Sequence, residues 1–160
     1  MVREQDFVSV EREIRALKRP LAAVVHNAID FGDFLYSEIG NMSQFDAVLQ
    51  SGLVGVASLT QKLLPLLRES HGRVVGISSG SSFLPGGGNG AYGATKAGLN
   101  MFLASLRVEM LPHKVAVLNV VPCFIRTELM DSEAGMKEFF YRQVRPATNA
   151  QSNALLAECR

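Results

Sequence analysis

Three short apolar runs, separated by longer amphipathic stretches, constrain the fold of this chain most strongly. They cover residues 21–26, 73–78 and 115–121, and they are rich in valine and other residues that favour strands. None of the three alternates cleanly between apolar and polar positions. That pattern is typical of strands buried on both faces of a parallel sheet. The sequence therefore predicts three parallel strands.

Helices are predicted between these strands. Apolar residues recur at helical spacing over residues 7–17, 43–70 and 92–111, and Pro20 and Pro112 follow the first and third of these stretches. Strands that alternate with helices at this spacing favour an α/β fold. We expect a partial Rossmann-like, doubly wound parallel sheet with flanking helices.

The long middle helix carries its own boundary signals. Ser43 and Asp46 have the spacing of a capping box at its start, and Gly72 suits its C-terminal cap. Pro65 lies inside the stretch, and a proline there predicts a kink or an early end.

Length and composition limit the domain count and the classes of partner. The 160 residues suit a single domain, 1–160, with a helical tail over about residues 131–160. Sixteen basic and 15 acidic residues leave a net charge of +1, so no nucleic-acid or anionic-membrane partner is expected. No apolar run reaches the length of a membrane span, and two cysteines make no disulfide framework. We expect a cytoplasmic protein.

Tyr92 and Lys96 are the first candidate site residues. Four positions apart at the start of a predicted helix, their side chains share one face. An ammonium near a phenol lowers the pKa of the phenol, which makes tyrosine a usable acid and base. The alternative is an ordinary surface pair. Ser79, at the end of the second predicted strand, favours a site because its hydroxyl can face the phenol and hold a substrate oxygen.

Two short motifs resemble those of other sites. Residues 88–93 read G-x-G-x-x-G, but the nearest strand ends about ten positions earlier, so a dinucleotide fingerprint is disfavoured. Residues 76–80 read G-x-S-x-G, in which Ser78 would be a hydrolase nucleophile. No helix is predicted directly after it, and the acid and histidine downstream suit a triad poorly. A serine hydrolase stays a distant alternative.

The larger pattern resembles a known family. Gly72-Arg-Val-Val-Gly-Ile-Ser-Ser79, Tyr92-Gly-Ala-Thr-Lys-Ala-Gly98, and Val115-Ala-Val-Leu-Asn-Val-Val-Pro122 followed by Thr127 are similar to the short-chain dehydrogenase/reductase family. The resemblance implies an enzyme that transfers hydride between NAD or NADP and a small alcohol or carbonyl substrate. Tyr92 would be the general acid/base, Lys96 would lower its pKa and bind the nicotinamide ribose, and Ser79 would position the substrate oxygen.

The resemblance also implies cofactor contacts and shows departures. Asn27 and Ala28 match the middle of the family's Asn-Asn-Ala-Gly segment, and Ile125 and Thr127 match the segment that holds the carboxamide. This sequence departs from the family pattern at four positions: His26 and Ile29 stand at the ends of that segment, Gly52 stands where the long helix usually offers an asparagine, and Cys123 replaces a glycine.

The family's glycine-rich turn and first three strands have no counterpart in this sequence. The three strands are expected to match the fourth, fifth and sixth of the family's sheet, with the pyrophosphate site missing. The alternative function is therefore a truncated, non-catalytic protein that acts as a partner-binding or regulatory subunit. The resemblance also implies a homo-oligomer through the two long helices. No cluster of ligands at metal-binding spacing is present in the sequence, so no metal is expected.

Overall fold

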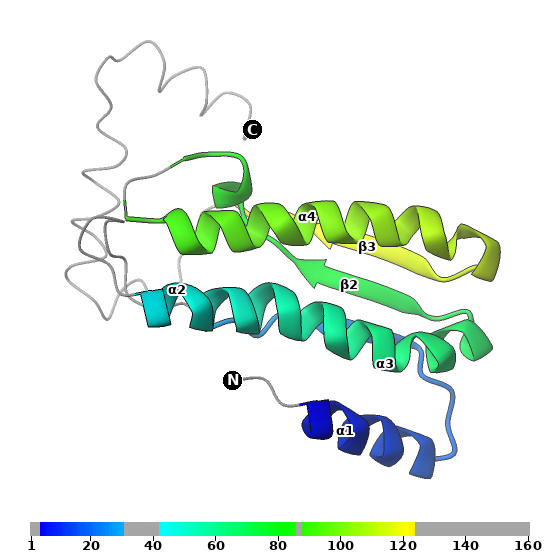
Figure 1. Ribbon diagram of the computed structural model, residues 1–160. Helices are drawn as coiled ribbons and strands as arrows, with labels where there is room; N and C mark the ends of the chain where they lie inside the picture. Colours follow the sequence, from blue (N-terminus) through cyan, green and yellow to red (C-terminus); the bar gives the residue numbers. More distant parts are fainter. Residues whose placement is uncertain (1–3, 31–41, 86–87, 124–160) are drawn as a thin grey trace. The chain divides into compact units, whose positions relative to one another are not determined.

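The computed structural model describes residues 4–30, 42–85 and 88–123 (Figure 1). The chain divides into two compact units, Met1–Val121 and Pro122–Arg160. Of the second unit only Pro122 and Cys123 are among the described residues, and Cys123 is a free, exposed thiol. The helical tail predicted over about residues 131–160 lies outside them, and the single domain over 1–160 stays a prediction.

A three-stranded parallel sheet forms the centre of the first unit. Its strands are β1 (Ala23–His26), β2 (Arg73–Ile77) and β3 (Ala116–Val120), in the order β1-β2-β3. Val25 pairs with Val75, and Val75 pairs with Leu118. The three predicted strands and their parallel arrangement are confirmed, each one or two residues shorter than the apolar run that contains it.

The helices alternate with the strands as predicted. Helix α1 spans Glu4–Ala16, α2 spans Met42–Leu49, α3 spans Gly55–Ser70, and α4 spans Gly90–Met110. A π-helical segment, η1 (Gln50–Val54), joins α2 to α3, and two 3-10 turns, η2 (Gly80–Ser82) and η3 (Leu111–His113), flank α4. The α/β fold class is confirmed.

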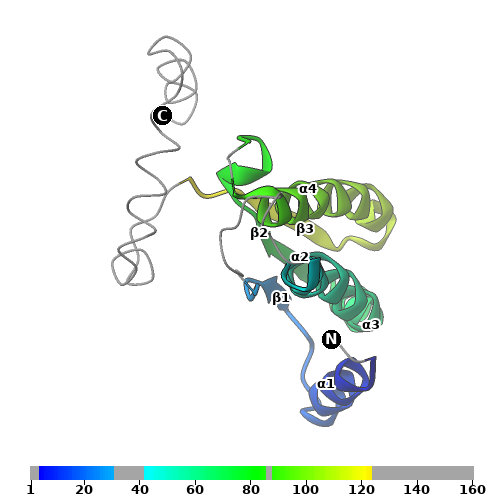
Figure 2. The same cartoon turned by 60° about the vertical axis from the view of Figure 1, so that its left-hand side comes forward.

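The core lies between one face of the sheet and the helices α3 and α4, which run side by side along it (Figure 2). Inward-pointing Val74 and Val117 meet leucines of both helices, among them Leu63, Leu67, Leu99 and Leu103. Residues of the opposite sheet face are open: Val25 is 59% exposed and Leu118 is 54% exposed. In the part of the chain that the structure describes, the helices therefore cover one face of the sheet.

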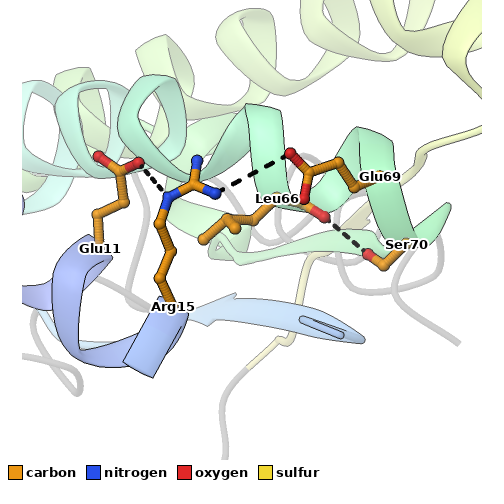
Figure 3. A network of polar contacts seen from close by, with 5 residues as sticks. All are labelled: Glu11, Arg15, Leu66, Glu69 and Ser70. Carbon is orange, nitrogen blue, oxygen red and sulfur yellow. Dashed lines mark hydrogen bonds and ion pairs between the residues drawn. The ribbon is translucent and has the colours of Figure 1, made fainter. Parts of the chain in front are cut away.

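Helix α1 packs against α3 through a mixed apolar and polar contact. Ile14 lies against the core, whereas Val10 and Leu17, which share its predicted apolar stripe, are exposed. Arg15 Nε bonds Glu11 Oε1 at 2.9 Å, and Arg15 Nη1 lies 4.0 Å from Glu69 Oε1 of α3 (Figure 3). These ion pairs are exposed, and pairs of this kind contribute little to stability. The Ile14 packing therefore matters more.

The long helix differs from its predicted boundaries at three places. Helix α2 begins at Met42, so Ser43 lies in its first turn and is not the cap. Helix α3 continues through Pro65 to Ser70. The residue in the left-handed conformation that ends α3 is His71, with φ 50°, and not Gly72.

Gly72 has a different reason to be glycine. A Cβ at this position would lie 2.7 Å from the Leu21 carbonyl oxygen and 2.8 Å from Leu67 Cδ2. The Gly72 amide donates to Leu67 O at 2.8 Å, which closes the end of α3. Glycine is required here because the Leu21 carbonyl oxygen, just before β1, and the Leu67 side chain approach the backbone at position 72 too closely for a Cβ. The backbone conformation of the residue is not the reason.

The π-helical segment η1 is the irregular part of the long helix, and Gly52 lies at its centre. A Cβ on Gly52 would lie 2.5 Å from Ile29 Cδ1 and 2.6 Å from Thr95 Cγ2. The neighbouring Ser51 hydroxyl accepts a hydrogen bond from the Asp30 amide at 2.9 Å. The Ile29 side chain thus occupies the space that a side chain at position 52 would need.

Gly52→Ala is expected to destabilise the fold by about 1–3 kcal/mol, because the methyl group overpacks the contact with Ile29 and Thr95. Ile29→Ala removes one of the two obstacles, so the double variant should lose less stability than the sum of the single variants. Urea unfolding measures all three. Gly90→Ala, at an exposed helix start, is the control and should be close to neutral. Strict additivity of Gly52→Ala and Ile29→Ala would contradict this packing.

Candidate active site

The candidate site lies where the parallel strands end. Their carboxyl ends share one edge of the sheet, so the segments that leave them lie close together. Asn27 and Ala28 follow β1 and are exposed, and Ser78 and Ser79 follow β2. Ile125 and Thr127, which were predicted to contact the cofactor beyond β3, lie outside the described residues.

Ser79 is held by the 3-10 turn η2 that follows it. Its backbone is extended, with φ −159°, and its hydroxyl accepts a hydrogen bond from the Ser81 amide at 3.2 Å. The same side chain forms a hydrogen bond with Tyr92 of α4. The structure therefore brings Ser79 and Tyr92 together across thirteen positions of sequence.

Tyr92 lies in the first turn of α4 and is partly buried. Burial raises the pKa of its phenol above the ordinary value, and the hydrogen bond from Ser79 opposes this rise. The sequence predicted a pKa lowered by Lys96. The structure differs because burial outweighs the favourable contacts of the phenolate in this arrangement.

Lys96 lies one helical turn beyond Tyr92 and is 4% exposed. Its Nζ donates to the Ile77 carbonyl oxygen at 2.6 Å and lies 5.5 Å from the centroid of the Tyr92 ring. Burial lowers the pKa of this ammonium. The cation thus lies over the face of the ring, held by the end of β2, which is a cation–π arrangement.

The donors of Lys96 fit the ribose of a nicotinamide cofactor. An ammonium has three N–H donors, and among the described residues Ile77 O is its one hydrogen-bond acceptor. A buried ammonium that has one of its three N–H donors engaged by the protein suits a ligand that carries several hydroxyl groups. Exposed Asn27 and Ala28 lie at the same edge of the sheet. The residues present therefore fit the nicotinamide–ribose half of such a cofactor.

His26, the first departure from the family's Asn-Asn-Ala-Gly segment, is a buried residue. Its Nε2 is 2.8 Å from Thr60 Oγ1 of α3, and its residue is 8% exposed. Burial lowers the pKa of His26 from 6.5 to about 4. The histidine therefore ties the end of β1 to α3 in its neutral form.

The two motifs that resemble other sites have structural explanations. Ser78 is 2% exposed, and its hydroxyl donates to the Lys96 carbonyl oxygen at 3.3 Å. A 3-10 turn follows it, so Ser78 has neither the exposure nor the following helix of a hydrolase nucleophile. Gly88, with φ 74°, belongs to the loop before α4 and does not follow a strand.

Sequence reasoning missed three polar residues that connect Ser79 to its surroundings: Ser82, Asn100 and Asn119. Asn100 bonds both other residues. The available signal was its spacing, because Asn100 lies four positions after Lys96 and eight after Tyr92, on the same face of α4.

Among the residues that the structure describes, no group of three or more histidine, cysteine or carboxylate side chains is placed to hold a metal ion. No helix among them has the length and apolar character required to cross a membrane.

The buried His26 is expected to make stability depend on pH. Its folded pKa of about 4 lies below the unfolded value of 6.5, so the unfolded chain takes up the proton first as pH falls. The contribution of neutral His26 to the free energy of unfolding is fully present above pH 6.5. It is lost as the pH falls to about 4, which lowers the free energy of unfolding by about 3 kcal/mol in total.

Urea unfolding at several pH values, compared between the parent protein and His26→Asn, isolates the contribution of His26 to the pH dependence of stability. The free energy of unfolding of the parent should fall relative to that of His26→Asn as the pH is lowered from 6.5 to about 4. A difference that stays constant from pH 7 to pH 4 would contradict a buried neutral histidine.

Comparison with known proteins places the chain in a family. The family model for short chain dehydrogenases matches residues 2–138. Estradiol 17-beta-dehydrogenase 2 of Mus musculus is 35% identical over 113 residues, which are 71% of this chain and 30% of that protein. The chain thus spans less than a third of the length of this relative.

Solved structures share the fold. The KRED1-Pglu enzyme matches with a TM-score of 0.77 and 25% identity, over 98% of this chain and 63% of that one. A short-chain dehydrogenase from Escherichia coli CFT073, complexed with NADPH, matches with a TM-score of 0.76 and 26% identity, over 88% of this chain and 59% of that one. Together with the match over residues 2–138, these similarities show that the chain belongs to the short-chain dehydrogenase/reductase family.

Proposed function

We propose that this protein is an NAD(P)-dependent oxidoreductase that interconverts an alcohol and a carbonyl compound. The observation that carries the proposal is the convergence of Ser79, Tyr92 and Lys96 at the carboxyl end of β2. The Ser79 hydroxyl forms a hydrogen bond with the Tyr92 phenol, and the buried Lys96 ammonium, bonded to the Ile77 carbonyl oxygen, lies 5.5 Å from the centroid of the Tyr92 ring. Family membership supports the same reaction class.

Tyr92 is the proposed proton donor and acceptor. Because burial raises its pKa, the phenol is the form present at neutral pH, and its Oη proton is available to the carbonyl oxygen of a substrate. Carbonyl reduction consumes this proton. Alcohol oxidation needs the phenolate, so it is favoured as pH rises toward the raised pKa.

Ser79 and Lys96 support that proton transfer. The Ser79 hydroxyl, fixed by the Ser81 amide, hydrogen-bonds the same substrate oxygen and orients it toward the phenol. The positive charge of Lys96, over the Tyr92 ring, stabilises the phenolate when it forms. The proposed catalytic residues are therefore Ser79, Tyr92 and Lys96.

The proposed cofactor is NAD or NADP, which when bound accepts or supplies the hydride at its nicotinamide. Tyr92 and Lys96 are the proposed contacts for the nicotinamide ribose, and Asn27 and Ala28 are proposed to line the cofactor along β1. The family match extends through Ile125 and Thr127, the proposed carboxamide contacts. A complex of a similar E. coli protein with NADPH supports this class of cofactor.

The proposed substrate is a small alcohol or carbonyl compound. The name of the similar mouse protein, estradiol 17-beta-dehydrogenase 2, makes a steroid alcohol the first probe to use. We further propose a cytoplasmic location, supported by two cysteines that make no disulfide framework, and no nucleic-acid or membrane partner, supported by the net charge of +1.

A second candidate function is a non-catalytic subunit that binds a partner. The observation that favours it is the open sheet: among the described residues β1 is an edge strand, and Val25 and Leu118, on the face that no described helix covers, are more than half exposed. An unpaired edge is a template for association with another chain. This candidate predicts a folded protein that binds no nicotinamide nucleotide.

Tyr92→Phe is expected to lower turnover by about 10²–10⁴-fold, because phenylalanine keeps the ring and loses the transferable proton. The measurement is nicotinamide absorbance with NADH or NADPH and a panel of ketones that includes estrone. Ser105→Ala, exposed on the same helix, is the matched control and should keep full activity. Unchanged turnover in Tyr92→Phe would contradict the assignment of Tyr92 as the proton donor and acceptor.

A nucleotide titration separates the two candidate functions. Saturable binding of NADH or NADPH, followed by nucleotide fluorescence, supports the oxidoreductase. A folded chain that shows no saturation by either nucleotide supports the partner-binding subunit.

A homo-oligomer through the long helices is also proposed, supported by an exposed stripe on α4 that contains Ala97, Met101, Ala104 and Val108. Met101 is 69% exposed and Val108 is 67% exposed. Met101→Glu with Val108→Glu is expected to convert the oligomer to a monomer in sedimentation analysis, because charges are costly in an apolar interface. Val8→Glu on α1 is the control. An unchanged oligomer in the double variant, or a monomeric parent, would contradict the proposal.

A further inference from the structure

Asn100 continues the row of site residues along α4. Tyr92, Lys96 and Asn100 are spaced by four positions each, so they lie on one face of the helix in successive turns. The first two residues reach the proposed reaction centre directly. Asn100 reaches it indirectly, through the serine turn that follows β2.

A chain of three side-chain hydrogen bonds runs from β3 to Ser79. Asn119 Nδ2 of β3 donates to Asn100 Oδ1 at 2.9 Å, and Asn100 Nδ2 donates to Ser82 Oγ at 2.8 Å. The Ser82 hydroxyl then donates to the Ser79 carbonyl oxygen at 2.5 Å. Each group donates once toward Ser79, so the chain has a single direction.

This direction is set by the amide of Asn100. Because its oxygen accepts the Asn119 proton, its nitrogen must face Ser82. Ser82 Oγ accepts that N–H, so its own proton is left for the Ser79 carbonyl oxygen. Asn119 Oδ1 is buried and has no hydrogen-bond partner among the described residues. Burying an acceptor without a hydrogen-bond partner lowers the stability of the fold. A gain in folding stability alone therefore does not explain why Asn100 and Asn119 are partly buried here.

Both oxygens of Ser79 are consequently fixed by η2. Its carbonyl oxygen accepts from the Ser82 hydroxyl and from the Ser82 amide at 3.0 Å. Its hydroxyl accepts from the Ser81 amide at 3.2 Å. With one acceptor position engaged by the turn, the hydroxyl has a restricted set of directions for its bond to Tyr92.

We propose that Asn100 is a positioning residue that acts through Ser82 to hold η2 and thereby aim the Ser79 hydroxyl at Tyr92. Asn119 orients the Asn100 amide. None of the three contacts the reacting atoms. The effect of Asn100 on activity rests on the function proposed above, whereas its effect on the serine turn does not.

Amide hydrogen exchange on the 160-residue chain tests the structural part. In Asn100→Ala and in Ser82→Ala, the amide of Ser81 is expected to exchange about fivefold faster than in the parent, because one stabilising hydrogen bond of the turn is lost. Ser78, whose amide bonds Val120 O at 2.8 Å in the sheet, is the internal reference and should be unchanged.

Two further variants sharpen this test. Asn100→Asp keeps the size of the side chain and an acceptor for Asn119 but loses the donor to Ser82, so it should loosen the turn as Asn100→Ala does. The double variant Asn100→Ala with Ser82→Ala should exchange no faster than the more affected single variant, since both act through one chain. Ser105→Ala should match the parent. Unchanged Ser81 exchange, or strictly additive effects, would overturn the proposal.

The activity arm separates positioning from a general structural role. Asn100→Ala is expected to lower kcat about tenfold in the parent background and to have no further effect once Ser79→Ala is present. An equal loss in both backgrounds would overturn the proposal. Absence of turnover in the parent would refute the proposed function alone, since the exchange experiment decides on the turn without it.

Discussion

The close approach of α4 to β2 is the contact on which the rest of the site depends. A Cβ on Gly76 would lie 2.3 Å from Leu103 Cδ1, so glycine at this position of β2 lets the Leu103 side chain of α4 pack directly on the sheet. At this separation the Lys96 side chain reaches the Ile77 carbonyl oxygen, and Tyr92 reaches Ser79. A larger residue at position 76 would require the Leu103 side chain to shift.

Burial has the same electrostatic consequence for three groups near the ends of the strands. It raises the pKa of Tyr92 and lowers the pKa values of Lys96 and His26, so in each case it favours the neutral form. The groups differ in what opposes this effect. Tyr92 has the Ser79 hydroxyl and Lys96 has a carbonyl oxygen, whereas the hydrogen-bond partner of His26 among the described residues is the Thr60 hydroxyl, and His26 titrates near pH 4. The ends of the strands are consequently a desolvated edge of the sheet, where the neutral forms of these three groups are favoured.

Two departures from the family pattern explain each other. Ile29 replaces a glycine and Gly52 replaces an asparagine, and the isoleucine side chain fills the space above the glycine. Ser51 supplies a polar contact between the same two segments by accepting the Asp30 amide. In place of a polar side chain at position 52, this chain has the apolar contact of Ile29 with Gly52 and the hydrogen bond to the Ser51 hydroxyl. These two contacts join the segment after β1 to η1.

The sequence by itself determined the strands, the helices, the parallel sheet and the Ser79–Tyr92–Lys96 group, because periodicity and local spacing carry that information. Pro65 and Ser43 misled the prediction of helix boundaries, since packing outweighs local preference. The pKa direction of Tyr92, the burial of His26, the Ile29–Gly52 contact and the amide row ending at Asn119 were decided by the tertiary structure alone. Each depends on distances between segments far apart in the chain, and no local pattern of residues encodes such distances.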